Sequence, residues 1–477
     1  MKKNSASKIN NRNLVLVIGF LFFFAYFFLA IWYYKERTLF ADTANFLFQM
    51  INLNSFFIAA ERWSEIIIQL FPLAVIKSDG SLPNILLAYS FSSAFFHFLV
   101  FLLITFVLRN YKASILLLIT LTLTVRHTFY AANSEFSHGL SCCILFFALM
   151  EKVLEKNVRS QPRDIFAALF TIIVCVFFHP LLAAPLMYVL VHVSIAQKAY
   201  FTKSSMLIFI GIVLVFGLKF LSIEDNSYEN TQIPTLNTIV MGLLNFTDLQ
   251  SFIYFKEFVF NEFGFVLLVV IISISAGIYQ KHYVLTVLFI LAGLLYTLAI
   301  LLAYHYGESP YLYQQRFVLY GFIIAIYMGG LLKSAQQEKV FNYLSLAIIF
   351  ISLFQIYNYH EIPSKRISYV DKLMGQEKSL NHNDKFILKR KDFLWDVAWL
   401  TWSLPCESIL ISSLKGKNET KTICVDISKE QNLSLQAQGG KFYITSSKLM
   451  NFSDLNKNYF NLKEETPYRV IVVNGKN

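Results

Sequence analysis

Residues 14–34 form an apolar run of about twenty residues that contains no charged side chain. An α-helix of this length spans roughly 30 Å, which matches the hydrocarbon core of a bilayer. No small-residue cleavage site follows the run, so we do not expect it to be removed as a signal peptide. Positively charged flanks stay in the cytoplasm, which predicts a membrane helix with a cytoplasmic N-terminus. The basic residues before the run are Lys2, Lys3, Lys8 and Arg12.

The composition extends this prediction to the whole chain of 477 residues. Hydrophobic residues make up 56% and charged residues 15%, whereas about a quarter of the residues of a soluble domain are charged. Much of the Lys and Arg lies in short loops between apolar runs, so the net charge of +11 does not indicate nucleic acid as a partner. We expect a polytopic α-helical membrane protein with roughly eleven transmembrane helices, at residues 14–34, 84–108, 114–125, 139–150, 165–178, 181–196, 207–221, 265–279, 284–303, 317–332 and 341–358.

Two further segments, at about residues 42–77 and 235–262, mix apolar residues with charges and are predicted to be helices lying along the outer interface. Beyond the last apolar run, Lys, Asp, Glu and Asn become frequent. We therefore expect residues 1–358 to form the multi-span transmembrane domain and residues 359–477 to form a small, soluble α/β domain on the extracytoplasmic side. Strand character is expected at residues 408–412, 441–445 and 468–473.

Two cysteines, Cys406 and Cys424, lie in this C-terminal part of the chain. An oxidising exterior permits a disulfide between them, and two free thiols remain the alternative, because sequence spacing does not establish a distance. In the transmembrane part, the short runs at residues 114–125 and 139–150 flank a group of polar residues. This pattern predicts helices that stop part-way through the membrane and leave a water-filled cavity between them.

The distribution of ionisable residues is one-sided. Inner loops hold mostly Lys and Arg, whereas a mixture of acids, Arg and His is assigned to the outer ends of the spans. Arg binds phosphate through paired donors, His can donate a proton, and a carboxylate can deprotonate a hydroxyl. Each residue also has a structural interpretation as a helix cap, a helix stop or a solvated charge. The candidate site residues are Asp42, Arg62, Arg126, His127, Glu135, His138, His179, His305, Glu308 and Arg316.

The overall plan resembles the integral-membrane glycosyltransferases of the C superfamily (GT-C), which include protein mannosyltransferases and the aminoarabinose transferases of lipid A. The resemblance rests on a cytoplasmic N-terminus, the acidic Asp42 in the first outer loop, interfacial helices in that loop, many irregular spans and an outer C-terminal domain. It implies that Asp42 acts on the acceptor or organises a metal. It also implies that the donor phosphate is held by a second set, comprising Arg126, His127, His305 and Arg316.

The sequence also departs from that family. Many members carry a pair of acids in the first loop, whereas Asp42 has no adjacent acid. The Trp-Trp-Asp signature of oligosaccharyltransferases is absent, which argues against protein N-glycosylation. The resemblance therefore concerns architecture and leaves the acceptor open.

The function expected from this reasoning is transfer of a sugar from a polyprenyl-phosphate carrier to a glycan, lipid or protein of the cell envelope. Catalysis is assigned to Asp42, with a divalent metal ion as an optional cofactor. The Lys-, Asn-, Ile- and Phe-rich composition points to a bacterium, and hence to its cytoplasmic membrane. Two alternatives remain: an O-antigen polymerase or ligase, and a lipid or solute transporter. A transporter predicts polar groups near the bilayer midplane and often repeated halves.

Overall fold

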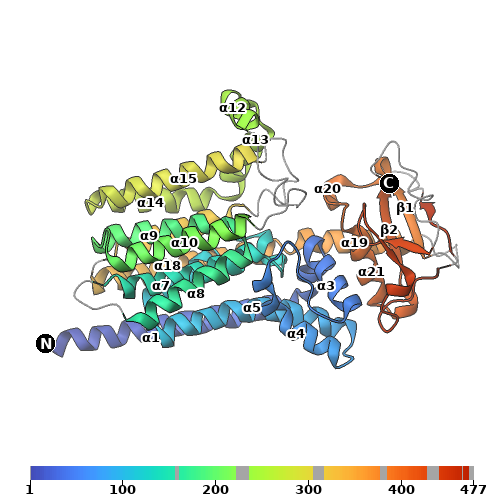
Figure 1. Ribbon diagram of the computed structural model, residues 1–477, viewed down its shortest axis with the longest axis horizontal. Helices are drawn as coiled ribbons and strands as arrows, with labels where there is room; N and C mark the ends of the chain where they lie inside the picture. The colour runs from blue at the N-terminus through green and yellow to red at the C-terminus, as the bar shows by residue number, and fades with distance from the viewer. Residues whose placement is uncertain are drawn as a thin grey trace.

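The protein is described from a computed structural model, which places an elongated helical bundle beside a group of C-terminal helices and strands (Figure 1). The N-terminus lies at the far end of the bundle, and the last strands lie beyond its other end (Figure 1). We call this second end the distal end. The described residues are 2–155, 161–221, 236–303, 316–332, 334–375, 384–426, 440–464 and 466–471.

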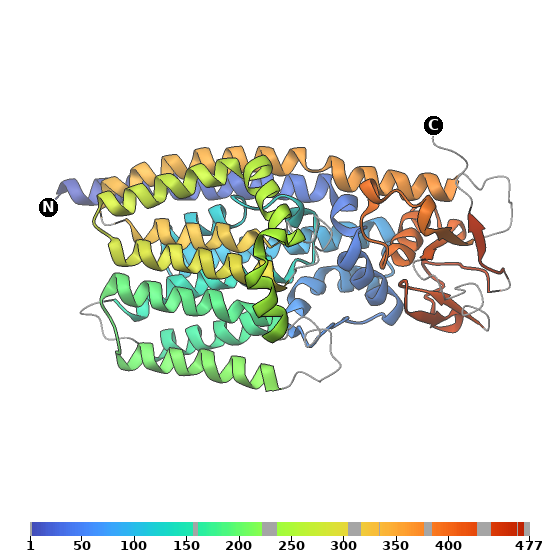
Figure 2. The same cartoon turned by 90° about the horizontal axis from the view of Figure 1, so that it is seen from above.

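Each of the eleven apolar runs expected to cross the membrane contains a helix. Two of these helices, α1 and α18, run side by side along the bundle (Figure 2). The helices are α1 (Lys2–Trp32), α5 (Leu82–Leu102), α6 (Tyr111–Thr120), α7 (Glu135–Val153), α8 (Pro162–Phe178), α9 (Ala183–Gln197), α10 (Lys203–Leu221), α14 (Gly264–Tyr279), α15 (Tyr283–Ala303), α17 (Val318–Gly330) and α18 (Ala335–Asn358).

Within the described residues, seven helices are long and apolar enough to cross a membrane, or eight if one sharply bent pair forms a single span. The expected count of eleven is therefore not confirmed. Helices α6 and α17 are apolar but shorter. Large apolar side chains lie exposed on the bundle surface, such as Phe24 at 74% and Leu295 at 65% exposure. Exposing such side chains to water is unfavourable, whereas contact with lipid is not. These features fit a helical protein embedded in a membrane.

Helices also occupy both segments that were expected to be interfacial. Between α1 and α5 the chain forms α2 (Tyr34–Thr38), α3 (Ala41–Leu53) and α4 (Ile66–Lys77), which lie at the distal end (Figure 1). The second segment contains α12 (Leu236–Leu244) and α13 (Gln250–Glu257), and the helical stretch ending at Glu262 meets α14 at 84°. Their position at a membrane interface stays a prediction.

Local sequence signals explain several helix boundaries. Asn110 caps α6 by accepting a hydrogen bond from the backbone N–H of Ala113, and Ser334 with Gln337 forms a capping box at the start of α18. Helix α8 ends where His179 precedes Pro180, because a residue before proline is pushed into extended backbone. His179 is thus a helix stop, and this places its ring at the distal end.

The connection between α6 and α7 contains the polar residues that were expected to border a cavity. After Thr120 the chain turns and forms a single 3-10 turn, His127–Tyr130, before α7 begins. A cavity does lie beside this connection, but the space open to the centre of a water molecule is about 10 Å³. That volume holds about one water, so the expected cavity is much smaller than a substrate.

The C-terminal segment, residues 361–471, contains helices and two small sheets. Strand β1 pairs in parallel with β2 and β5, in the order β2-β1-β5, and β3 pairs with β4 as an antiparallel hairpin. The elements are α19 (Glu361–Gly375), β1 (Lys385–Lys389), α20 (Trp395–Ala398), α21 (Leu404–Ser413), β2 (Thr422–Asp426), β3 (Lys441–Tyr443), β4 (Leu449–Asn451) and β5 (Arg469–Ile471).

Strands are confirmed within residues 441–445 and 468–473, but the strand expected at 408–412 is wrong because these residues lie inside α21. All ten residues of α21 are buried, so no exposed polar face reveals a helical period. Of the two alternatives left open for Cys406 and Cys424, the structure shows the free thiols: both are free, buried cysteines. Cys406 instead contacts the carbonyl of Ile444 at 2.7 Å.

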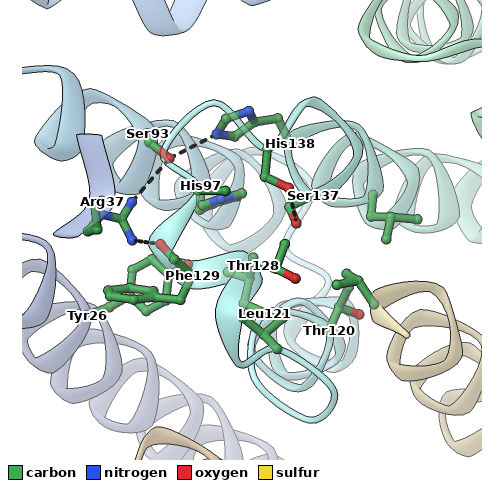
Figure 3. Close-up of a pocket in the computed structure, with 15 residues that line it drawn as sticks. Tyr26, Arg37, Ser93, His97, Thr120, Leu121, Thr128, Phe129, Ser137 and His138 are labelled. Carbon is green, nitrogen blue, oxygen red and sulfur yellow. Dashed lines mark hydrogen bonds between the residues drawn. The ribbon is translucent and has the colours of Figure 1, made fainter. Parts of the chain in front are cut away.

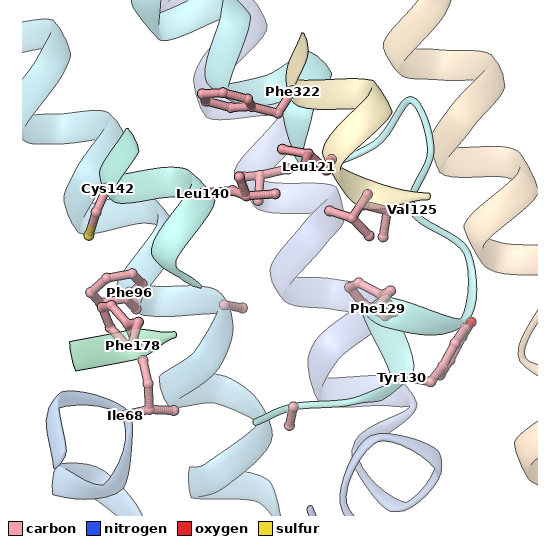
Figure 4. Close-up of a cluster of buried hydrophobic side chains, with 14 of the residues drawn as sticks. Ile68, Phe96, Leu121, Val125, Phe129, Tyr130, Leu140, Cys142, Phe178 and Phe322 are labelled. Carbon is pink, nitrogen blue, oxygen red and sulfur yellow. The ribbon is translucent and has the colours of Figure 1, made fainter. Parts of the chain in front are cut away.

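One continuous apolar core joins the bundle to the C-terminal segment. Its members run from Val15 in α1 to Ile471 in β5 and include Phe96, Leu140 and Phe322, which Figure 4 shows among the buried side chains. Phe48 of α3 packs on Phe460 with ring centroids 5.4 Å apart. The C-terminal segment is therefore packed directly onto α3.

A buried ion pair fixes this contact. Arg366 of α19 donates to both carboxylate oxygens of Glu407 in α21, at 2.8 and 3.0 Å, and the two side chains are 2% and 0% exposed. The backbone N–H of Ala41 donates to the same carboxylate at 3.0 Å. Ala41 is in left-handed backbone, with φ 48°, immediately before Asp42. Glu407 thus holds the first residue of α3 against the C-terminal segment.

We predict that Arg366→Ala destabilises the protein by about 3 kcal/mol, because it leaves the Glu407 charge buried without its main partner. Lys365→Ala is the matched control: it removes an exposed pair with Glu361 one residue away, which contributes at most about 0.5 kcal/mol. Thermal unfolding of both purified variants in detergent measures the difference. Equal melting temperatures for the two variants would contradict the structural role of Glu407.

Candidate functional site

Four ionisable side chains meet at the distal end between the first loop and α7. Arg62 forms an ion pair with Glu135, the first residue of α7. Three residues after Arg62, Glu65 ends a 3-10 turn and its Oε1 lies 3.2 Å from Nδ1 of His138, one turn further along α7. Arg62 and Glu65 are three residues apart, and so are their partners Glu135 and His138 in α7. The two pairs therefore lie side by side. We call Arg62, Glu65, Glu135 and His138 the acid–base group.

Asp42 lies beside this group. It occupies the first turn of α3, its side chain is exposed, and it interacts electrostatically with Glu135 and with Tyr89 of α5. Tyr89 also interacts electrostatically with Glu65. Three carboxylates therefore share one region with the guanidinium of Arg62. Asp42 is the carboxylate that solvent reaches, whereas Glu65 is fully buried.

A chain of hydrogen bonds continues from Glu65 into the bundle. His138 Nε2 lies 3.0 Å from the hydroxyl of Ser93, and that hydroxyl oxygen accepts a bond from Arg37 at 3.4 Å (Figure 3). Arg37 is 2% exposed and also donates to Ser90 and to the carbonyl of Phe129. The adjoining cavity holds about one water, so Ser93 has no room for a substrate. The chain therefore positions Glu65.

Two further basic side chains approach the group from other elements. His179, at the end of α8, lies within electrostatic range of Arg62 and of Arg316, which precedes α17. The ring of His179 packs edge-on against Phe136, next to Glu135. Arg62 and Arg316 thus supply cationic groups on one side of the acids. Burial holds the pKa of His179 well below its usual value, and its Nδ1 accepts from the N–H of Leu181, so this neutral ring offers its Nε2–H as a donor. A negatively charged group such as a phosphate would find several donors there.

Arg126 and His127 belong to a different group. Arg126 is 1% exposed and donates to the carbonyls of Thr122 and Val125 and to the side chain of Gln355 in α18. The ring of His127 packs against Tyr359 and Trp399, with centroids 5.1 and 5.6 Å away. These hydrogen-bond partners, all in the described part of the chain, lie outside the acid–base group. Its contacts are those of a side chain that ties the α6–α7 connection to α18.

Burial also decides the charge of His127. Desolvation lowers the pKa of its imidazole to about 3, so the ring is neutral at ordinary pH. A neutral imidazole with so low a pKa is a poor proton donor near neutrality. We therefore assign His127 to ring packing within this second group.

The structure brings together six of the ten predicted site residues, which are Asp42, Arg62, Glu135, His138, His179 and Arg316. His305 and Glu308 lie outside the described residues. Within the described part of the chain, no three His, Cys, Asp or Glu side chains are arranged to hold a metal ion. The expectation of a divalent metal therefore has no ligand set here.

The sequence reasoning missed Glu65, Tyr89, Ser93 and Arg37. A signal existed for Glu65, because a charged residue three positions from Arg62 in a largely apolar stretch indicates a shared helical face. Tyr89 and Ser93 lie one turn apart in α5, but a Tyr or Ser in an apolar run carries no distinctive pattern. Only the packing of α5 against the first loop identifies them.

Glu65 makes a testable contribution to the pH dependence of stability. Burial raises the pKa of its carboxyl to about 8, and Arg62 offsets this only in part. In the unfolded chain this carboxyl loses its proton near pH 4.3, whereas in the folded protein it keeps the proton to about pH 8. The free energy of unfolding therefore decreases as the pH rises from about 4.3 to about 8.

We predict that Glu65→Gln flattens the decline in melting temperature between about pH 5 and pH 8, because the amide does not ionise. Glu361→Gln, which changes an exposed carboxylate in α19, is the control and should retain the wild-type profile. Differential scanning fluorimetry across this pH range makes the comparison. Identical profiles for Glu65→Gln and wild type would refute the assignment.

Comparison with protein-family models, with curated proteins and with solved structures finds no match to this chain.

Proposed function

We propose that this protein is a membrane glycosyltransferase that transfers a sugar from a polyprenyl-phosphate carrier to an acceptor of the cell envelope, on the extracytoplasmic face of a bacterial cytoplasmic membrane. The observation that carries the proposal is the convergence of an exposed carboxylate, Asp42, with buried acids and three basic side chains at one end of an apolar bundle. The basic residues in the first turns of α1 support a cytoplasmic N-terminus and hence an outer location for this end.

The chemistry of sugar transfer matches these groups. The acceptor hydroxyl must lose a proton as it attacks the sugar, and the departing polyprenyl phosphate must be stabilised as negative charge develops on it. In our proposal Asp42 accepts the proton because it is the exposed acid of the group. Arg62, His179 and Arg316 donate to the phosphate. The carrier chain lies against the apolar surface of the bundle.

The distribution of polar groups favours this proposal over a transporter. The acid–base group lies where α7 begins and α3 and α4 pack, at the distal end, whereas a transporter site near the membrane centre would lie midway along the helices. The contact of the C-terminal segment with Ala41 places that segment next to Asp42. An acceptor held by the C-terminal segment would then be close to the proposed base.

We predict that Asp42→Asn lowers the rate of sugar transfer at least about 100-fold, since the amide cannot accept the proton. Asp79→Asn, an exposed acid in the same stretch between α1 and α5, is the control and should retain the wild-type rate. Transfer is measured in proteoliposomes with a panel of synthetic polyprenyl-phosphate sugars and native membrane lipid or glycan as acceptor. An active Asp42→Asn enzyme would exclude Asp42 as the base.

We also predict that undecaprenyl phosphate raises the melting temperature of the wild-type protein and that Arg316→Ala abolishes this increase, since a bound ligand stabilises the folded state. Arg126→Ala should retain the increase relative to its own ligand-free baseline, because Arg126 belongs to the other group. The reverse result, with loss only in Arg126→Ala, would move the phosphate site to α18. No stabilisation of the wild type would count against a polyprenyl-phosphate carrier.

A further inference from the structure

Two buried oxygens beside the acid–base group have no hydrogen-bond partner among the described residues: Oε2 of Glu65 and the hydroxyl of Tyr89. Both side chains are 0% exposed. The two groups interact electrostatically, so they lie near each other. A buried polar group without a partner destabilises a protein by about 1–3 kcal/mol, so each of these two atoms is expected to bind a water molecule or a ligand group.

The other carboxylate oxygen of Glu65, Oε1, is hydrogen-bonded to Nδ1 of His138. The proton positions along this chain can therefore be assigned. Arg37 is only a donor, so Ser93 accepts from it and has its own O–H to give. We assign that O–H to Nε2 of His138, which leaves the proton of His138 on Nδ1, where it is donated to Oε1 of Glu65. Oε2 is then the oxygen left for a ligand.

The two unpartnered atoms define the group that would satisfy them. An ionised Glu65 needs a donor, and the Tyr89 O–H needs an acceptor. A phosphate offers no donor to an ionised Glu65, and burying its charge beside two fully buried side chains would carry a large desolvation cost. An ammonium has no lone pair to accept from Tyr89. A hydroxyl both donates and accepts, so one hydroxyl satisfies both atoms, and it does so equally if Glu65 is protonated and donates instead.

We propose that Glu65 and Tyr89 form a buried subsite for a hydroxyl group of a saccharide, next to Asp42. The proposal rests on the proposed function and adds to it that the acceptor is polyhydroxylated. A neighbouring hydroxyl held at this subsite would orient the attacking hydroxyl toward Asp42, the exposed acid that interacts electrostatically with Tyr89. His138 and Ser93 act as positioning residues because they hold Glu65 in the orientation described above.

The test uses the full-length protein purified in a polyoxyethylene detergent, which carries no sugar. Octyl β-D-glucoside, added below its micellar concentration, is the probe, and its tetra-O-methyl derivative, which lacks every O–H, is the matched compound. We expect the glucoside to raise the melting temperature and the methylated compound to have no effect. Tyr89→Phe and Glu65→Gln should each weaken the apparent affinity for the glucoside about tenfold, as expected for one lost hydrogen bond in a dry site.

Two controls separate binding from folding. Tyr130→Phe also removes a buried tyrosine hydroxyl, but one that already donates to the carbonyl of Ile356 at 2.8 Å, so it should lower the baseline stability and leave the glucoside affinity unchanged. Stabilisation by undecaprenyl phosphate should persist in Tyr89→Phe. Unchanged glucoside affinity in Tyr89→Phe, or equal effects of the two glucosides, would overturn the subsite and indicate bound water instead. Loss of the undecaprenyl phosphate effect in the wild type would count against the proposed function alone.

Discussion

The free energy of burying a charge in a low-dielectric bundle limits where this chain can place ionisable groups, and the arrangement at the distal end follows from that limit. Arg62 forms an ion pair with Glu135. Glu65 is hydrogen-bonded to a neutral His138, which is linked in turn through Ser93 to the buried Arg37. Asp42 keeps its exposure and remains accessible. The buried acids are paired because an unpaired buried charge is costly, whereas Asp42, which is exposed to solvent, does not need such a partner.

The C-terminal segment depends on a second buried charge. Glu407 accepts two bonds from Arg366 and one from the backbone of Ala41, so a single carboxylate joins α19, α21 and the start of α3. The guanidinium of Arg366 also lies 4.7 Å from the centre of the Phe40 ring. Because Asp42 directly follows these residues, its position is set from the C-terminal segment as much as from the bundle. Changes in that segment are therefore expected to reach the proposed catalytic acid.

Prediction from the sequence succeeded where one physical signal dominated. Long uncharged runs identified the helices, and the proline after His179 marked the end of α8. It failed at α21, because a fully buried segment has the same apolar pattern as helix or strand. For Arg126, which lies at the outer end of a short run, the prediction of phosphate binding stays a prediction. Its side chain contacts Gln355 and Phe263.

The sequence by itself determined that the chain is a largely helical, membrane-compatible protein and indicated six of the ionisable residues that lie at the distal end, because length, apolarity and charge are local properties. Tertiary structure decided which of those residues meet. Glu65 reaches His138 across 73 positions, and Tyr89 joins them from a third element. Such contacts depend on how α5, α7 and the first loop pack, and pairwise packing across long separations leaves no pattern in a single sequence.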